Sequence, residues 1–176
     1  MVGDSMGVKY SSITENGSII DALITDRTAS DVAEAVSLAQ KISTGNATEA
    51  EIAEFLTVMK GSYNYTDMNR VGQAVAYLRD RLRDDAGTSV EVAPKTDWAN
   101  GDIPTPEQAA QYISDVKNIR AAFILPDGTP EAPDTLTGLT YSQANNIETI
   151  FQNLDKTIES LKITLITSGE VFSGEV

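Results

Sequence analysis

The amino-acid sequence predicts a mainly α-helical protein, with about five amphipathic helices in two duplicated helical hairpins and short β-arms or hairpins at the N- and C-termini. Apolar residues recur at helical spacing through most of the chain. The middle also contains an internal repeat: TEAEIAEFLTVMK (48–60) aligns with TPEQAAQYISDVK (105–117), and YTDMNRV (65–71) with YSQANNI (141–147). We therefore expect a β-prone arm at 1–26, a helical domain at 27–162 with repeat units at about 48–82 and 105–158, and a β-prone arm at 163–176.

The N-terminal arm contains two β-prone stretches, 8–13 and 18–24, on either side of the dipeptide Asn16-Gly17. Asn-Gly is a strong signal for a two-residue hairpin turn, so this arm is expected to be extended or to fold back as a hairpin. A first helix is predicted from about 28 to 43, ending before Gly45, with one apolar stripe at Val32, Val36, Ala39 and Ile42.

The first repeat unit predicts two helices. Thr48 and Glu51 have the spacing of a capping box, and Gly61 suits the end of that helix. Thr66 is the expected cap of the next helix, whose apolar stripe comprises Met68, Val71, Val75, Leu78 and Leu82. The short link between the two helices predicts an antiparallel hairpin.

The second repeat unit begins with Thr105, Pro106 and Gln108, a capping box with proline in the first helical turn. Prolines and glycines at 125–138 predict a loop. The last helix is expected to start at a cap, Thr140 or Ser142, and to run to about residue 162. The β-branched segment that follows either pairs with the N-terminal arm or adds to a sheet of a neighbouring subunit.

Composition excludes several classes of site. The 176 residues contain no cysteine and no histidine, so disulfides, thiolate metal sites and histidine general bases are all excluded. A formal charge of −13 disfavours nucleic acid as a partner. No apolar run approaches the roughly 20 residues that span a bilayer, and residues 1–10 lack the pattern of a signal peptide, so we expect no membrane contact and a site of synthesis inside a cell.

The candidate site residues are few. Asp97 and Asp102 flank a glycine-containing loop, but without the regular ligand spacing of an EF-hand they indicate a turn, and we predict no metal, no cofactor and no catalytic residue. Tyr63 and Trp98 are aromatic residues able to contact a partner or stack on a glycan. Val171 and Phe172, in the C-terminal arm, are the other predicted partner contacts.

Several blocks of the sequence resemble virion structural proteins of phages and prophages of Gram-positive bacteria. The blocks are LITDRT (23–28), KGSYNYTDMNRV (60–71), KTDW (95–98) leading to IPT (103–105), LTYSQANNIE (139–148) and the closing SGEV repeat (168–171 and 173–176). The resemblance covers most of the chain from about residue 23 onward. It implies a place in a virion, in the tail or baseplate, and no catalytic residues.

These observations together predict a noncatalytic virion structural protein, made in the host bacterial cytoplasm, that assembles through its terminal arms and exposed loops. Its expected partners are other virion structural proteins and further copies of itself. A head decoration, neck or fibre position is the alternative within the same class. A receptor or glycan-binding module, with a host-surface glycan on Tyr63 and Trp98, is the alternative from another class, and a carboxylate-based glycosidase acting on cell wall ranks third.

Overall fold

The computed structural model describes the backbone of residues 18–172 and the side chains of residues 18–164. Within this part of the chain the protein is mainly α-helical, as predicted, with five α-helices and no strand. The elements are η1 (Ile19–Ala22, a 3-10 helix), α1 (Ala29–Ser43), α2 (Glu49–Thr57), α3 (Tyr65–Ala86), α4 (Pro106–Ala121) and α5 (Tyr141–Phe172).

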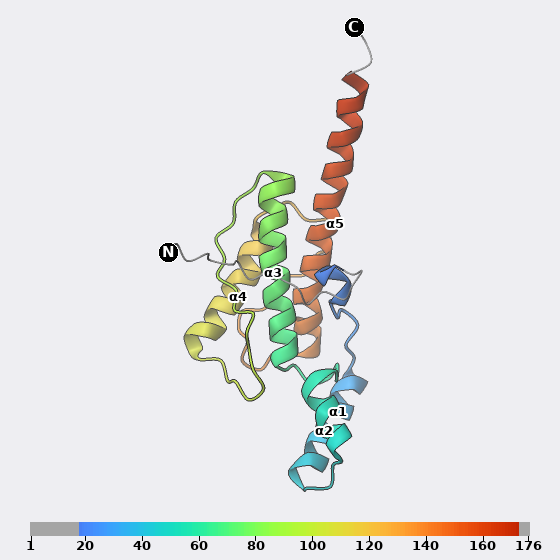
Figure 1. Ribbon diagram of the computed structural model, residues 1–176, viewed down its shortest axis with the longest axis vertical. Helices are drawn as coiled ribbons and strands as arrows, with labels where there is room; N and C mark the ends of the chain where they lie inside the picture. The colour runs from blue at the N-terminus through green and yellow to red at the C-terminus, as the bar shows by residue number, and fades with distance from the viewer. Residues whose placement is uncertain (1–17, 173–176) are drawn as a thin grey trace, which may run out of the picture.

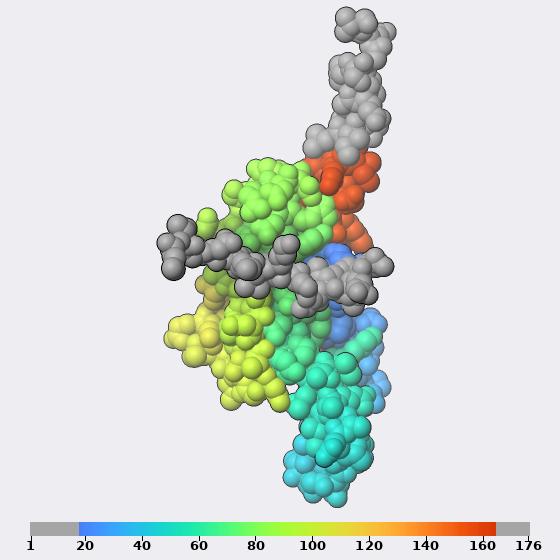
Figure 2. Space-filling view, viewed as in Figure 1, coloured from blue at the N-terminus to red at the C-terminus, as the bar shows by residue number. Residues whose placement is uncertain are grey.

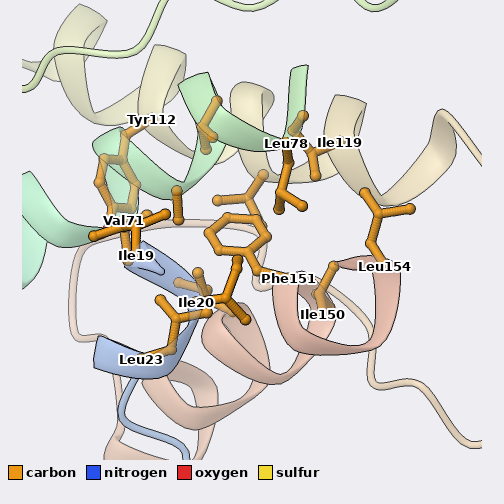
Figure 3. Packing of buried hydrophobic residues seen from close by; sticks show 14 of the residues in the cluster. Ile19, Ile20, Leu23, Val71, Leu78, Tyr112, Ile119, Ile150, Phe151 and Leu154 are labelled. Carbon is orange, nitrogen blue, oxygen red and sulfur yellow. The ribbon is translucent and has the colours of Figure 1, made fainter. Parts of the chain in front are cut away.

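Helices α3, α4 and α5 form a bundle, and η1 packs against α3 and α5 (Figure 1). Phe151 of α5 is fully buried at the centre of the core, close to Ile20 from η1 and Leu78 from α3 (Figure 3). The apolar stripes predicted for α3 and α5 are the ones that enter this core. Burial of such side chains is the main favourable term in folding, at about 1.5–3 kcal/mol for each large aliphatic or aromatic residue.

Helices α1 and α2 form a separate hairpin at one end of the bundle (Figures 1 and 2), whereas the far part of α5 projects at the other end (Figure 1). The hairpin has a small core of its own, with Ala35, Leu38 and Met59 buried and Phe55 packed against them. It closely approaches the junction to α3 at Gly61, where a Cβ would lie 1.9 Å from the carbonyl oxygen of Asp31. Only glycine therefore fits at this contact.

The predicted caps are largely confirmed, because capping depends on local sequence. Thr48 and Thr105 each cap a helix in a complete capping box. At the start of α5, Thr140 is the cap, since its hydroxyl accepts the amide of Gln143 at 3.2 Å. Helix α3 differs from the prediction: its cap is Asn64, and its first residue is Tyr65.

The predicted hairpin topology is wrong for both repeat units. Helix α2 packs along α1, and it meets α3 end to end, where the Thr66 hydroxyl donates to the Thr57 carbonyl at 2.9 Å. Helices α3 and α5 run parallel, because ion pairs join Arg70 to Glu148 near their N-terminal ends and Asp85 to Lys162 further along. Segments 87–105 and 122–140 return along the bundle, so α3, α4 and α5 all run in the same direction (Figure 1).

The predicted β-arms are wrong wherever the structure describes them. In the N-terminal arm, residues 19–22 form η1, and residues 1–17, with the Asn16-Gly17 turn, lie outside the described residues. In the C-terminal arm, α5 continues to Phe172, and residues 173–176 lie outside the described residues. The stripe predicted for the first helix is also wrong at Val36, which is 62% exposed. Ala35 and Leu38 are buried instead, because α1 packs on α2 and not on the bundle.

Candidate functional site

Four buried or nearly buried charged side chains meet where η1, α3 and α5 come together. We call Arg27, Asp67, Arg70 and Glu148 the charge cluster. Arg27 lies in the segment between η1 and α1, Asp67 and Arg70 lie in the first turns of α3, and Glu148 lies in the third turn of α5. Glu148 is fully buried, and Arg27 and Asp67 are each 4% exposed. Two cations therefore balance two anions inside the protein.

Each member of the charge cluster contacts more than one other group. Arg27 Nη2 donates to Asp67 Oδ1 at 2.8 Å and to Glu148 Oε1 at 2.7 Å. Arg70 donates from Nε to Glu148 Oε2 and from Nη2 to Glu148 Oε1, both at 3.0 Å, and it also pairs with Asp67. The amide of Ile24 donates to Glu148 Oε2 at 2.6 Å. The cluster therefore ties the N-terminal segment to both α3 and α5.

The electrostatics of the cluster favour the charged form of its two arginines. Burial acts to lower the pKa of Arg27, but the nearby carboxylates of Glu148 and Asp67 outweigh it and raise that pKa above its ordinary value. The same balance raises the pKa of Arg70. Both carboxylates and both guanidinium groups are engaged by partners in the same chain. The cluster therefore holds the N-terminal segment, α3 and α5 together within one chain.

Tyr63, one of the predicted contact residues, contacts the charge cluster through Arg27. Its ring lies 5.5 Å from the guanidinium carbon of Arg27, within the range of a cation–π contact, and its hydroxyl hydrogen-bonds to that of Tyr112. Burial raises the pKa of Tyr63. The side chain is half-buried, and both its ring and its hydroxyl already have partners within the chain.

Trp98, the other predicted aromatic contact, is only 5% exposed. Its backbone is clamped by the Asn69 side chain, which accepts from Trp98 N and donates to Trp98 O, both at 2.8 Å. Lys95 Nζ lies 4.8 Å from the centroid of the indole. A ring that stacks on a sugar needs one open face, and this conformation offers almost none. A glycan contact at Tyr63 and Trp98 stays a prediction.

A cavity of about 210 Å³ lies beside Trp98, between α3, α4 and residues 93–98. Gly72 allows this segment to approach α3, because a Cβ there would lie 2.3 Å from the carbonyl oxygen of Lys95. Asp115 Oδ1, on the cavity wall, accepts from the Ala93 amide at 3.0 Å and from Gln111 Nε2 at 2.8 Å. The cavity is smaller than the roughly 300–1,000 Å³ typical of ligand pockets, so it suits at most a very small group.

The loop at residues 97–102, which the sequence analysis considered as a calcium site, forms a turn. Asp102 Oδ2 accepts the amide of Ala99 at 2.8 Å, and Asp97 pairs with Lys95. Across residues 18–164, no group of three or more acidic side chains is placed to hold a metal ion. Among the helices described, none is long and apolar enough to cross a membrane.

The C-terminal part of α5 continues past the end of α3. We call residues 163–172 the α5 extension. The ion pair of Lys162 Nζ with Asp85 Oδ1, at 3.4 Å, joins α5 to α3 next to the end of α3, and the extension then continues past the bundle (Figure 1). The backbones of Val171 and Phe172, the remaining predicted contact residues, lie at its tip.

Sequence reasoning missed the charge cluster and the α5 extension. The signal for the cluster was the presence of Asp67, Arg70 and Glu148 directly beside stripe residues of predicted helices. The signal for the extension was an apolar spacing of three and four that does not stop at residue 162. No protein-family model, curated protein or solved structure matches this chain.

Proposed function

We propose that this protein is a noncatalytic structural protein of a phage virion, associated with the tail or baseplate, that assembles with neighbouring subunits. The observation that carries the proposal is the α5 extension, a helix that continues past the end of α3 (Figure 1). A helix that projects in this way is suited to holding a neighbouring subunit. In this proposal, the α5 extension makes the contact with a neighbouring subunit that the sequence analysis assigned to a C-terminal strand.

Two further features support an assembly role. Ile103 and Ile124, in the loops on either side of α4, are 87% and 88% exposed, so the loops present aliphatic side chains to a neighbour. The blocks that resemble virion proteins also converge in space, because LITDRT, KGSYNYTDMNRV and LTYSQANNIE supply Arg27, Asp67, Arg70 and Glu148 to the charge cluster. The residues that carry the resemblance thus include those that lock the fold.

Immunogold labelling of purified phage particles tests this proposal. We expect antibody against the protein to label the tail end of the particle. Particles from a lysogen that lacks the gene serve as the control for nonspecific labelling. Label on the head would overturn the tail assignment, and particles without label would overturn the virion assignment as a whole.

A further inference from the structure

The cavity beside Trp98 is lined by two polar side chains whose bonding is incomplete. Asp115 is only 2% exposed, and its Oδ1 atom accepts the amide of Ala93 and the side chain of Gln111. Its Oδ2 atom accepts no hydrogen bond, and no lysine or arginine of residues 18–164 forms an ion pair with it. The indole N–H of Trp98 is also buried and has no acceptor in the described chain. We call this space the Trp98 cavity.

Asp115 lacks the cation that the other buried acids of the described chain have. Buried charges in proteins are normally paired, because the loss of hydration is large and a partner of opposite sign is needed to offset it. Asp67 and Glu148 follow this rule, since each pairs with both Arg27 and Arg70. A cation bound at Asp115 would complete the same pairing in the Trp98 cavity.

The chain does not supply this cation itself. Lys95 is the only cationic residue that lines the Trp98 cavity. Its ammonium group pairs with the carboxylate of Asp97 and lies 4.8 Å from the centroid of the Trp98 indole. Because Lys95 is engaged in these two contacts, the cation that Asp115 lacks has to come from another molecule.

The residues around the cavity favour an organic cation over a metal ion. Asp115 is the only acid among them, whereas a hard cation such as calcium takes about six to eight oxygen ligands. Much of the remaining wall is apolar, with Val71, Val75, Pro94 and Trp98. A cavity of about 150 Å³ can hold a benzene molecule, so one of about 210 Å³ has room for a short alkyl chain with a charged head.

The Trp98 cavity opens at the protein surface, because Gln108 and Gln111 of α4 also line it and are exposed. We propose that it binds an aliphatic cation, that is, an ammonium or guanidinium group on a short alkyl chain. The charged head pairs with Asp115, and the chain lies along the apolar wall. A free small amine and a lysine or arginine side chain of a neighbouring subunit share this chemistry. The site goes beyond the proposed assembly role and does not depend on it.

Titration of the full-length chain with n-butylammonium, followed by NMR, tests the site. Trp98 is the only tryptophan, so its indole N–H gives a single resonance that reports on the cavity. We expect a saturable shift, and about tenfold weaker binding of 1-butanol, which has the same alkyl chain without the charge. Sodium chloride at the same ionic strength should give no saturable shift. Equal binding of the amine and the alcohol, or no saturable shift with the amine, would overturn the proposal.

Asp115→Asn removes the charge and keeps an oxygen for the amide of Ala93. We expect it to weaken butylammonium binding about tenfold, whereas Glu107→Gln, the same change at an exposed position of α4, should leave binding unchanged. Equal effects of the two substitutions would overturn the proposal. So would butylammonium binding that appears only in Lys95→Met, because Lys95 would then be the partner of Asp115 in solution. The comparison of amine and alcohol uses the unchanged chain, so it decides the matter even if a variant does not fold.

A second ligand, Nα-acetyl-lysine N-methylamide, distinguishes the two sources of the cation. It presents a lysine side chain together with backbone carbonyl groups, which are acceptors of the kind that the Trp98 indole lacks. Binding at least as tight as that of butylammonium would support the site and assign it to a side chain of a neighbouring subunit. Binding of butylammonium alone would support the site and assign it to a free amine.

Discussion

At the scale of single residues, the charge cluster shows how buried charge can position elements. Breaking a buried ion pair by removing one partner costs about 3–5 kcal/mol, because the remaining charge is left without compensation. Arg27 is the member whose loss matters most, since it alone links the N-terminal segment to both Asp67 and Glu148. The sequence places the charged residues beside the apolar stripes but does not show which of them pair, because the cluster joins residues as much as 121 positions apart.

Replacing Arg27 by methionine tests how much the charge cluster stabilises the fold. We expect Arg27→Met to lower the free energy of unfolding by about 3 kcal/mol or more, since Asp67 and Glu148 are left with Arg70 as their only cation. Chemical denaturation followed by circular dichroism measures the change. Arg83→Met is the control, because Arg83 pairs only with exposed acids at the end of α3. Similar losses for the two variants would contradict a special role for the cluster.

Gly72 is the second residue whose identity is set by a close contact. Replacing a helical glycine by alanine normally favours the helix by about 1 kcal/mol. At Gly72 the added Cβ would lie 2.3 Å from a backbone oxygen, so we expect Gly72→Ala to destabilise the protein by about 1–3 kcal/mol. Displacement of residues 93–98 should also shift the emission of Trp98 to longer wavelength. Gln73→Ala, at the next position of α3, should change neither stability nor emission, and an unshifted Gly72→Ala spectrum would argue against the close contact.

At the scale of elements, the helix caps, which depend on neighbouring residues, were mostly predicted from the sequence. The directions of the helices, which depend on contacts between distant segments, were not. Thr48 and Thr105 could be recognised as caps because a cap bonds within three residues of itself. The direction of α4 relative to α5 depends on how segment 122–140 returns along the bundle, which spacing does not reveal. Residues 163–167 favour strand by composition, but they extend a helix already packed up to residue 162, and extending a helix is easier than starting a strand.

The α1–α2 hairpin should open independently of the bundle. Its core is small, and hydrogen bonds join it to the start of α3, from the Thr66 hydroxyl to the Thr57 carbonyl at 2.9 Å and from Asn64 Nδ2 to the Phe55 carbonyl at 3.5 Å. We expect Leu38→Ala to speed amide hydrogen exchange in α1 and α2 alone, because local opening of the hairpin leaves the bundle intact. Leu78→Ala is the matched change in the main core, and it should speed exchange throughout the chain. If Leu38→Ala speeds exchange equally in α3, the two parts unfold together.

Acid should act on the same hairpin through Glu51. Its hydrogen bond with the Lys41 side chain, followed by hydrogen bonds from Thr48, lowers the pKa of Glu51 from 4.5 to about 2. Because the folded-state pKa lies below the unfolded value, this stabilisation is fully present above pH 4.5 and is lost as the pH falls toward 2. We expect an NMR titration to give a pKa near 2, and Lys41→Met to raise it. Lys156→Met is the control on a distant helix, and a Glu51 pKa near 4.5 in the unchanged chain would contradict the pairing.

At the scale of the whole molecule, the α1–α2 hairpin and the α5 extension lie at opposite ends of the bundle (Figure 1). The acidic residues lie mostly on the bundle and the hairpin, and the α5 extension is nearly neutral. The sequence predicts a homo-oligomer that assembles through strand-prone arms. The structure has a helix where the C-terminal strand was expected, and the homo-oligomer stays a prediction.

The charge cluster also limits the order in which parts of the protein can fold during synthesis. Arg27, Asp67 and Arg70 leave the ribosome long before Glu148, the fully buried carboxylate that both arginines need. Until α5 has emerged, η1 lacks one of the two helices that it packs against, and the main core lacks Phe151 at its centre. The bundle therefore closes only after translation is nearly finished, whereas the α1–α2 hairpin, complete within the first third of the chain, can form while the ribosome is still at work.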